Sequence, residues 1–270
     1  MPDTFASSFT ALFLAALGIS VAIRIWLASR QIRHVCASRD RVPAEFADRV
    51  ALEAHRKAAD YTVAKVRFSF VALTVETALL LALTLGGGIE ALAAWWQARW
   101  PALTAGLGLI FSLLLISGAV DLPLAWWRQF VIEARFGFNR MTPGLFLADT
   151  LKSALLAAVI GAPVILAVLW LMGTMGSYWW LHVWLFWCCF NLLILFIYPT
   201  WIAPLFNKFE PLAEGEVRQR VEALLARCGF HSGGLFVMDG SRRSAHGNAY
   251  FKKKKKTKRI VFFDTLLKRL

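Results

Sequence analysis

Residues Asp239–Leu267 have the sequence DGSRRSAHGNAYFKKKKKTKRIVFFDTLL, the most distinctive run in the chain. Its apolar and aromatic residues predict two short β-strands, Ala249–Phe251 and Ile260–Phe263, joined by a basic turn. Asp264 then stands where a helix N-cap is expected, so a helix should begin there. The stretch therefore predicts a small β-hairpin followed by a helix, and the residues before it decide where that hairpin lies.

The rest of the chain is more apolar than an ordinary soluble domain. The 270 residues are 58% hydrophobic, have a mean hydropathy of +0.56, and include 12 Trp and 21 Phe. Such a composition indicates an integral membrane protein, and aromatic residues are enriched at bilayer interfaces. An ordinary soluble domain is therefore not expected.

Five stretches reach or approach the length of about 20 apolar residues that a membrane helix needs. They are Phe5–Leu27, Phe68–Leu85, Ala102–Leu124, Leu155–Met172 and Tyr178–Tyr198. The expected fold class is mainly α, a polytopic bundle of membrane helices with a small α+β hairpin unit. The expected domains are a membrane domain over residues 1–201 and a cytoplasmic unit over residues 202–270.

Basic residues alternate from loop to loop. The first loop, Ala28–Arg67, is rich in Lys and Arg, whereas the second, Thr84–Pro101, contains Arg99 as its only base. The third loop, Asp121–Lys152, is again basic, the fourth has no Lys or Arg, and the segment after Tyr198 is rich in both. Because basic loops stay in the cytoplasm, the N-terminus is expected outside and the C-terminal part in the cytoplasm.

Two ionisable residues fall inside the apolar stretches. Glu76 is in the middle of the second stretch, and Arg24 is near the inner end of the first. A charge at that depth costs about 3 kcal/mol unless it faces water or a partner. Two hypotheses stay open: the helices enclose a polar chamber, or Glu76 is paired inside the bundle for structural reasons.

Several local patterns predict further elements. The run Phe130–Thr142 predicts a helix that ends at Gly137, and Glu216–Cys228 predicts an amphipathic helix that ends at Gly229. Leu235–Met238 predicts a short strand. The four cysteines form no C-x-x-C pair and are expected to be free thiols; they are Cys36, Cys188, Cys189 and Cys228.

The first loop also contains ligand-type residues. Glu53, His55 and Asp60 do not fall on one helical face, so a solvated or hydrogen-bonded His55 is expected rather than a metal ligand.

Five motifs, spread over nearly the whole chain, form a specific combination although each alone is a weak signal. They are H-R-K-A-A-D-Y-T-x-A-K (55–65), F-V-I-E-x-R-F-G-F-N-R-M-T (130–142), I-A-P-L-F-N-K-F (202–209), D-G-S-R-R-S-A-H-G-N-A-Y-F (239–251) and K-R-I-V-F-F-D-T-L-L (258–267). Together they resemble the Ste24-type CAAX prenyl protease family, the integral membrane zinc metalloproteases of peptidase family M48.

The resemblance implies a ring of seven membrane helices around a large water-filled chamber, which a protease domain closes on its cytoplasmic side. It also implies zinc held by the two His of an H-E-x-x-H helix and by a downstream Glu, with the Glu of the motif activating water. Residues 202–270 then correspond to the start of the metalloprotease domain. The expected partners are a peptide or prenylated-peptide substrate and the lipid bilayer.

The resemblance assigns substrate binding to one strand. The N-A-Y/F segment of the family is an edge strand beside the catalytic cleft, and it pairs with an extended substrate through backbone groups. The corresponding residues here are Asn248, Ala249 and Tyr250. Asn248 is expected either to donate its amide to a substrate carbonyl or to be a turn residue at the start of the strand. His246 is expected either to orient the strand or to be a plain surface histidine.

The chain departs from the family pattern in two respects. None of its five His is followed by Glu, so it has no H-E-x-x-H, and the resemblance places the zinc helix shortly after Leu267. The catalytic residues and metal ligands are therefore expected to be absent from the 270 residues, which alone should bind no zinc and hydrolyse no peptide. In addition, Lys252–Lys256 replaces a glycine-containing turn usual in the family.

Two other functions compete with the metalloendopeptidase. One is a non-catalytic membrane module that binds lipid or peptide without cutting it. The other treats Lys252–Lys256 as a basic patch for anionic lipid, at about 1 kcal/mol per residue, or for nucleic acid. Nucleic acid is not expected as a partner, because no aromatic or helical recognition framework accompanies the lysines. The sequence favours the metalloendopeptidase.

Overall fold

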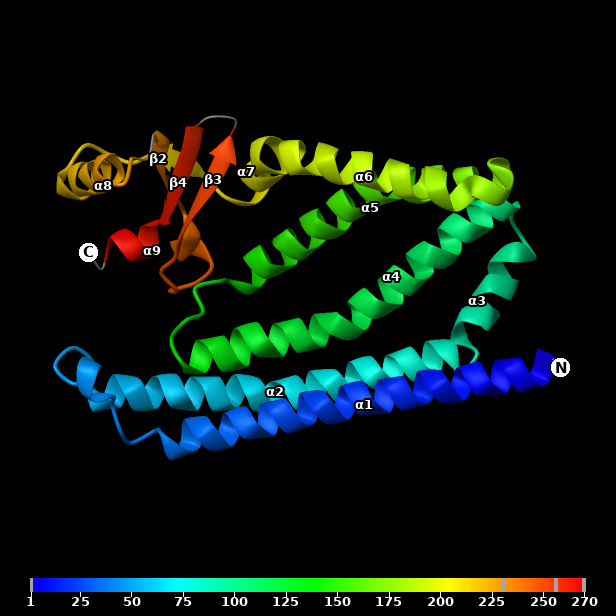
Figure 1. The fold of residues 1–270 in the computed structure, drawn as a ribbon, viewed down its shortest axis with the longest axis horizontal. Helices are drawn as coiled ribbons and strands as arrows, with labels where there is room; N and C mark the ends of the chain where they lie inside the picture. Colours follow the sequence, from blue (N-terminus) through cyan, green and yellow to red (C-terminus); the bar gives the residue numbers. More distant parts are fainter. Residues whose placement is uncertain (1, 230–231, 255–256, 269–270) are drawn as a thin grey trace. The chain divides into compact units, whose positions relative to one another are not determined.

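The structure, a computed structural model, describes residues 2–229, 232–254 and 257–268 (Figure 1). Its helices are α1 (Pro2–Ala37), α2 (Leu52–Thr84), α3 (Gly88–Gln97), α4 (Ala102–Trp127), α5 (Pro143–Thr174), α6 (Trp179–Ile197), α7 (Ala203–Phe206), α8 (Glu216–Arg227) and α9 (Asp264–Leu267). Its strands are β1 (Phe209–Pro211), β2 (Ser232–Met238), β3 (Ala249–Lys254) and β4 (Thr257–Phe263). Short π-helical turns follow α4 and α6, at Arg128–Glu133 and Tyr198–Ile202.

The chain divides into two compact units. The first consists of Met1–Trp95 and Phe111–Phe136, and the second of Trp96–Ile110 and Gly137–Leu270. Helix α4 contributes to both, because the division falls within it. This division is based on contacts between residues and does not test the domain boundary expected between residues 201 and 202. That boundary stays a prediction.

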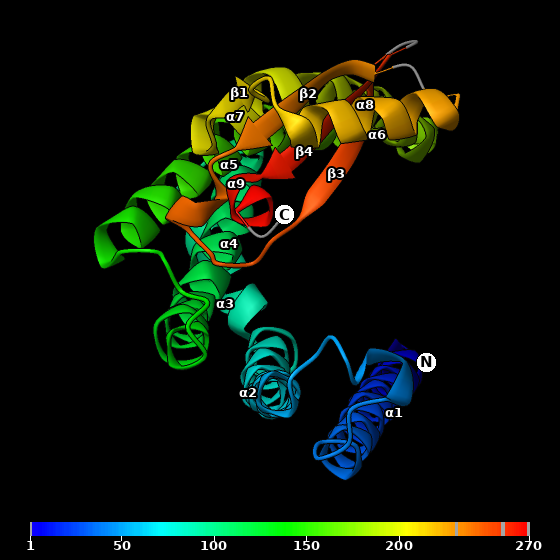
Figure 2. The same ribbon diagram turned by 90° about the vertical axis from the view of Figure 1, so that its left-hand side faces the viewer.

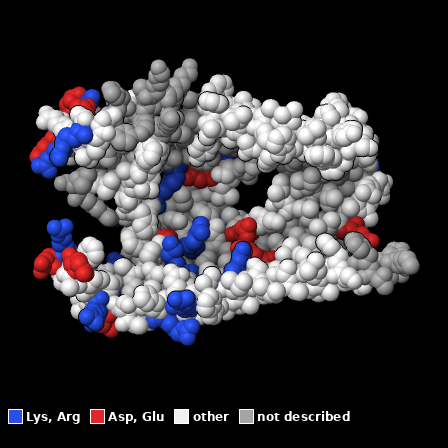
Figure 3. All heavy atoms as spheres, viewed as in Figure 1, with Lys and Arg blue, Asp and Glu red and all other residues white. Residues whose placement is uncertain are grey.

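Five helical stretches are long and apolar enough to cross a membrane. They are Ser7–Ala37, Leu52–Thr84, Ala102–Glu133, Pro143–Thr174 and Gly176–Ile197. In the space-filling view, most charged side chains of α1 and α2 gather toward the end where these helices are joined, and uncharged surface covers most of the rest (Figure 3). The predicted class, a mainly α bundle of five spans with a small α+β unit, is confirmed.

Helices α1 and α2 continue well beyond their apolar runs, and residues that directly follow α1 bind polar residues in the first part of α2. The guanidinium of Arg39 donates to both carboxylate oxygens of Asp60, at 2.8 and 2.9 Å. These hydrogen bonds and the carboxylate charge raise the pKa of Arg39. His55 donates through Nε2 to the carbonyl oxygen of Ser38 at 3.0 Å, which is the hydrogen-bonded histidine that the sequence predicts.

The segment Thr84–Pro101 was expected to be a loop, and this expectation is wrong, because it contains α3. Three successive glycines end α2, and Gly87 has φ 74°, a left-handed conformation that glycine adopts without strain. The residues that follow are mostly Ala, Leu and Trp, which helices accept readily, so a short helix forms before Pro101.

Capping residues fix the ends of several other helices. Thr142 accepts a hydrogen bond from the backbone N–H of Leu145 at 3.2 Å, and Pro143 follows it as the first residue of α5. Gly137, at φ 77°, ends the preceding helical run, and Gly229, at φ 65°, follows the end of α8. Both glycine stops confirm the sequence prediction.

The four strands form one mixed sheet in the order β1-β2-β4-β3, of which Figure 1 labels β2, β4 and β3. β1 is antiparallel to β2, β2 is parallel to β4, and β3 is antiparallel to β4. Leu235, Met238 and Val261 are buried in this unit, and α8 lies alongside β2 (Figure 2). The predicted hairpin is present as β3 and β4, and the third predicted strand is present as β2. Strand β1 was not predicted from the sequence.

The hairpin strands are longer than the sequence predicts. β3 extends through Lys254, and β4 begins at Thr257, so Lys252–Lys254 belongs to a strand rather than to the predicted turn. The remaining turn residues, 255–256, lie outside the described residues. The pairing between β3 and β4 extends into the lysine run, where Lys252 lies opposite Arg259.

Candidate functional site

Strand β3 is an edge strand. β4 pairs with one side of it, with Ala249 opposite Phe262 and Tyr250 opposite Val261. In the described part of the chain, no strand pairs with its other side. An edge strand presents backbone N–H and C=O groups that the sheet does not use, and an extended peptide binds by adding itself as a further strand. β3 is therefore a candidate peptide-binding edge.

Asn248 precedes β3 and is held at both its backbone and its side chain. Its carbonyl oxygen accepts a hydrogen bond from the N–H of Phe263 at 2.9 Å, and its Oδ1 accepts one from the N–H of Ala249 at 2.8 Å. The side-chain oxygen thus serves a local turn, which matches one of the two expectations. Nδ2 of Asn248 makes no hydrogen bond to the described residues, so this amide keeps its donors for a ligand.

His246 lies two residues before Asn248 and is exposed, but its ring and backbone both contact other residues. Its ring stacks on Phe138, with centroids 4.2 Å apart and planes inclined by 21°. Its carbonyl oxygen accepts a hydrogen bond from the hydroxyl of Thr265 at 2.8 Å. These contacts hold the segment that leads into β3, and an orienting role for His246 stays a prediction.

The aromatic residues of β3 differ in exposure. The ring of Tyr250 meets Phe263 edge-on, with centroids 6.4 Å apart, and Tyr250 is 37% exposed. Burial, helped by the nearby Tyr198, raises the pKa of the Tyr250 hydroxyl, which therefore stays protonated at physiological pH. Phe251 is 72% exposed, so an apolar surface borders the free edge of the strand.

Arg243 joins three segments around the loop that leads to β3. Its guanidinium donates to both carboxylate oxygens of Asp149, at 2.8 and 3.2 Å, and to Oδ1 of Asn207 at 3.0 Å. Asp149 lies in α5 and Asn207 directly follows α7. The side chains of Arg243 and Asp149 are only 21% and 15% exposed. The loop before β3 is thereby attached to the membrane helix α5.

Asp264 attaches the other end of the same loop. Its carboxylate accepts hydrogen bonds from the N–H of Ser241 at 2.8 Å, from the Ser241 hydroxyl, and from the N–H of Thr265 at 2.9 Å. Burial opposes ionisation, but these hydrogen bonds outweigh it and lower the pKa of Asp264. The sequence predicted Asp264 as the N-cap of a helix. In the structure Phe263 occupies the N-cap position, and Asp264 is the first residue of α9.

Sequence reasoning missed the arginine–aspartate pair and the serine–aspartate contact. Arg243 and Asp149 are 94 residues apart, so no local pattern joins them. The only local signal was that D-G-S-R-R places an acid, a hydroxyl and two bases in one turn before the strand.

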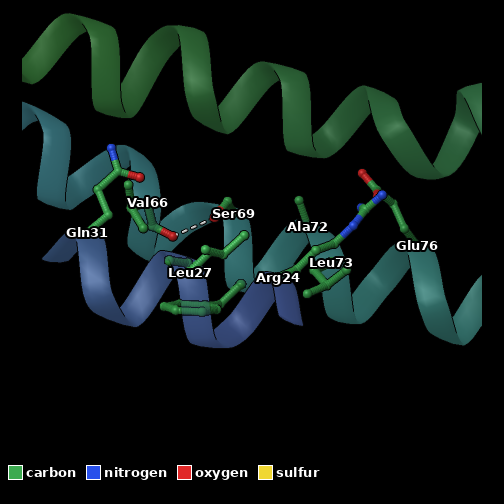
Figure 4. Close-up of a pocket in the computed structure, with 10 residues that line it drawn as sticks. Arg24, Leu27, Gln31, Val66, Ser69, Ala72, Leu73 and Glu76 are labelled. Atoms are coloured by element: carbon green, nitrogen blue, oxygen red, sulfur yellow. Dashed lines mark hydrogen bonds between the residues drawn. The ribbon is translucent and has the colours of Figure 1, made fainter. Parts of the chain in front are cut away.

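In the first unit, Arg24 and Glu76 point toward one another across a groove of about 420 Å³ between α1 and α2 (Figure 4). Gln31 and Ser69 also line the groove, together with apolar residues such as Leu73. This arrangement gives Glu76 a basic neighbour within the apolar span. The chamber that the resemblance implies stays a prediction.

Comparisons with known proteins identify the family of the chain. Residues 31–208 match the family described as CAAX prenyl protease N-terminal, five membrane helices, and residues 211–270 match peptidase family M48. The chain belongs to the Ste24-type CAAX prenyl protease family. The resemblance inferred from the five motifs is thereby confirmed, and membership in this family makes the chain part of an integral membrane protein.

Relatives of this family match along almost all of the chain. The CAAX prenyl protease 1 homologues of Caenorhabditis elegans and Homo sapiens are 35% and 37% identical to it, over 95% of the chain and 58% and 56% of their own length. The crystal structure of S. mikatae Ste24p superposes with a TM-score of 0.85 at 32% identity, over 95% of this chain and 61% of that one. The chain thus spans little more than half the length of these Ste24-type relatives.

Proposed function

We propose that the protein is a membrane-embedded zinc metalloendopeptidase of the CAAX prenyl protease type. Its substrates are C-terminal CAAX peptides, prenylated or not, or other membrane-associated peptides. The observation that supports this most directly is the free edge of β3, which begins with Ala249 and Tyr250 and directly follows Asn248. The names of the relatives, CAAX prenyl protease 1 homologues, support the substrate class.

The residues of this chain bind and orient the peptide in this proposal. An extended substrate pairs with the backbone of β3, and Nδ2 of Asn248 donates to a substrate carbonyl. The stack of His246 on Phe138 holds the strand at one end. Arg243 and Asp264 hold the loop before it, so the edge keeps one position relative to α5. The N-terminus is proposed to lie outside, and the sheet in the cytoplasm.

Zinc is proposed to be held by residues of the full-length protein outside this sequence. The 270 residues contain no H-E-x-x-H, and the described residues offer no group of three His, Cys, Asp or Glu suited to a metal. They do not fit a zinc site by themselves. When bound, zinc would polarise the scissile carbonyl and activate water.

A peptide-binding measurement on the purified chain in detergent micelles tests the proposal. We expect a labelled aliphatic peptide to bind without being hydrolysed, and we expect a full-length form to hydrolyse it only with zinc present. Hydrolysis by the 270 residues alone would show that the catalytic groups have been misassigned. A full-length form that is free of metal and inactive on membrane peptides would remove the peptidase proposal.

The absence of H-E-x-x-H from these 270 residues favours one other candidate, a membrane module that binds lipid or peptide without cutting it. The intact mass of the protein from its native membrane separates the two. A mass of 30.2 kDa together with binding but no turnover supports the module. A larger mass with zinc bound supports the peptidase.

A further inference from the structure

A polar pocket of about 510 Å³ lies beside the loop that leads into β3. Its lining residues are Arg140, Ser241, Ser244, Ala245, Thr265 and Lys268. All of them belong to the second compact unit, so the pocket lies within one part of the molecule. Two bases and three hydroxyl groups make its lining strongly polar.

The chemistry of the pocket suits an anion with planar oxygens. The guanidinium of Arg140 has no acidic partner among the described residues, and it presents a fork of N–H donors that matches a carboxylate. Lys268 adds a second positive charge. Lys268 interacts electrostatically with the carboxylate of Asp264, whose oxygens already accept hydrogen bonds from Ser241 and from the N–H of Thr265. The two bases therefore exceed the local negative charge.

The position of Arg140 is fixed relative to the segment that becomes β3. Its backbone N–H donates to the carbonyl of Arg243 at 3.2 Å, and the N–H of Ala245 donates to the carbonyl of Phe138 at 3.0 Å. A bridge between Asn139 and Ser244 completes a short antiparallel pairing. Part of the pocket lining, within residues 241–245, thus lies on the segment that continues into the candidate peptide-binding edge.

A peptide bound antiparallel to β3 would run toward the pocket. Antiparallel pairing is slightly more stable than parallel pairing, and a peptide antiparallel to β3 has its C-terminal end at Ala249. The pocket residue Ala245 lies four residues before Ala249, and four extended residues span at most ~14 Å. A few residues of peptide beyond the strand are therefore enough to bring its C-terminus to the pocket.

We propose that Arg140 and Lys268, with the hydroxyl of Ser244, bind the C-terminal carboxylate of a peptide paired on β3. The site then selects peptides by their free C-terminus, while the backbone of β3 binds any extended sequence. This inference rests on the proposed function, because it requires a peptide on that edge.

The test compares two probes that differ only at the terminus. They are the fluorescein-labelled pentapeptide Gly-Ser-Val-Ile-Ala as the free acid and as the amide, and their affinities for the purified chain in micelles are measured by fluorescence anisotropy. We expect the free acid to bind about tenfold more tightly, because a hydrogen-bonded carboxylate is lost in the amide. The preference should shrink as ionic strength rises.

Substitutions then assign the preference to the pocket. Arg140→Gln, combined with Lys268→Gln, should reduce the preference for the acid to about twofold or less while the amide binds as before. Arg140→Lys should keep part of it, since the charge remains but the fork is lost. Arg227→Gln, the same chemical change on α8, is the matched control and should keep the full preference. Unchanged circular dichroism establishes that the variants are folded.

The outcomes separate the two proposals. Equal binding of acid and amide by the unmodified chain overturns the carboxylate pocket and leaves peptide binding on β3 intact. An undiminished preference in the double variant also overturns it, because the selectivity then comes from other residues. Failure of both probes to bind overturns peptide addition on β3 and the pocket together. Competition by acetate at concentrations comparable with those needed for the peptide would show that the site binds a free carboxylate rather than a peptide terminus, and would also overturn it.

Discussion

Two ion pairs of nearly equal geometry lie in very different surroundings in the two units. Arg39 meets Asp60, and Arg243 meets Asp149, each through two hydrogen bonds between 2.8 and 3.2 Å. The first pair has side chains 37% and 46% exposed, whereas the second has 21% and 15%. Solvent screens the first pair more than the second. Removing one partner should therefore lower stability more for the second pair, and burial rather than distance decides the difference.

The two pairs also differ in what they join. Arg39 and Asp60 draw together the neighbouring ends of α1 and α2, which packing between the helices already holds side by side. Arg243 and Asp149 join a loop to a membrane helix across 94 residues of sequence. This loop leads into β3, so a change in the second pair should affect both stability and peptide binding.

The largest effect is expected from Asp149→Asn. The substitution leaves the charge of Arg243 half-buried without its acidic partner, which should lower the free energy of unfolding of the second unit by about 2 to 4 kcal/mol. Trypsin cleavage after Arg242 and Arg243 should also become faster. Both are measured on the purified chain in detergent, by thermal unfolding and by limited proteolysis. A loss no greater than that of Asp60→Asn would show that burial does not separate the two pairs.

Asp264→Asn is expected to have the next largest effect. It weakens hydrogen bonds from Ser241 and Thr265, and the loss, discounted for partial exposure, is about 1 to 2 kcal/mol. Because folding lowers the pKa of this carboxyl, its contribution is complete above the unfolded value of about 3.9 and disappears as pH falls through the folded value.

The check on Asp264 is the unfolding midpoint as a function of pH. The difference between the unmodified chain and the Asn variant should be constant near neutral pH and narrow below pH ~4. A difference that persists in strong acid would mean that the carboxylate charge does not stabilise the loop.

Asn248→Ala should weaken peptide binding about fivefold, because one hydrogen bond to the substrate is worth about 1 kcal/mol. Fluorescence anisotropy with the amide probe measures it. Asn191→Ala is the matched control, since the Asn191 amide donates to the carbonyl of Trp187 within α6. Equal affinity of the two variants would place Asn248 among turn residues without a role in binding.

The smallest effect is expected from Asp60→Asn. The pair with Arg39 is exposed and screened by salt, so the thermal midpoint should stay within the error of the measurement at physiological ionic strength. A clear loss of stability, equal in low and high salt, would contradict the view that exposure makes this pair weak.

Apolar run length was enough to predict five spans, and glycine chemistry was enough to predict the ends at Gly137 and Gly229. The full lengths of α1 and α2 could not be predicted, because contacts such as His55 with Ser38 stabilise helix beyond the apolar residues. Helix α3 was missed because three glycines and a nearby proline indicate a loop, although the intervening residues are good helix formers.

For the site, the predicted residues Asn248, Ala249 and Tyr250 fall together at the edge of the sheet, where their predicted role in binding is physically possible. That role itself stays a prediction. The pocket around Arg140 could not be predicted from local patterns, because its lining comes from three segments, and Arg140 is about 100 residues before the other two. Pairing between those segments decides whether the bases face a common space.

Hydrogen–deuterium exchange along β3 tests the central claim most directly. It is measured on the purified chain in micelles, with and without a saturating amount of the free-acid pentapeptide. If the peptide adds to the edge strand, exchange slows in fragments that contain Ala249–Phe251 and is unchanged in fragments from α8. Unchanged exchange in β3 at a peptide concentration that saturates the anisotropy signal would contradict the claim, because the peptide would then bind elsewhere.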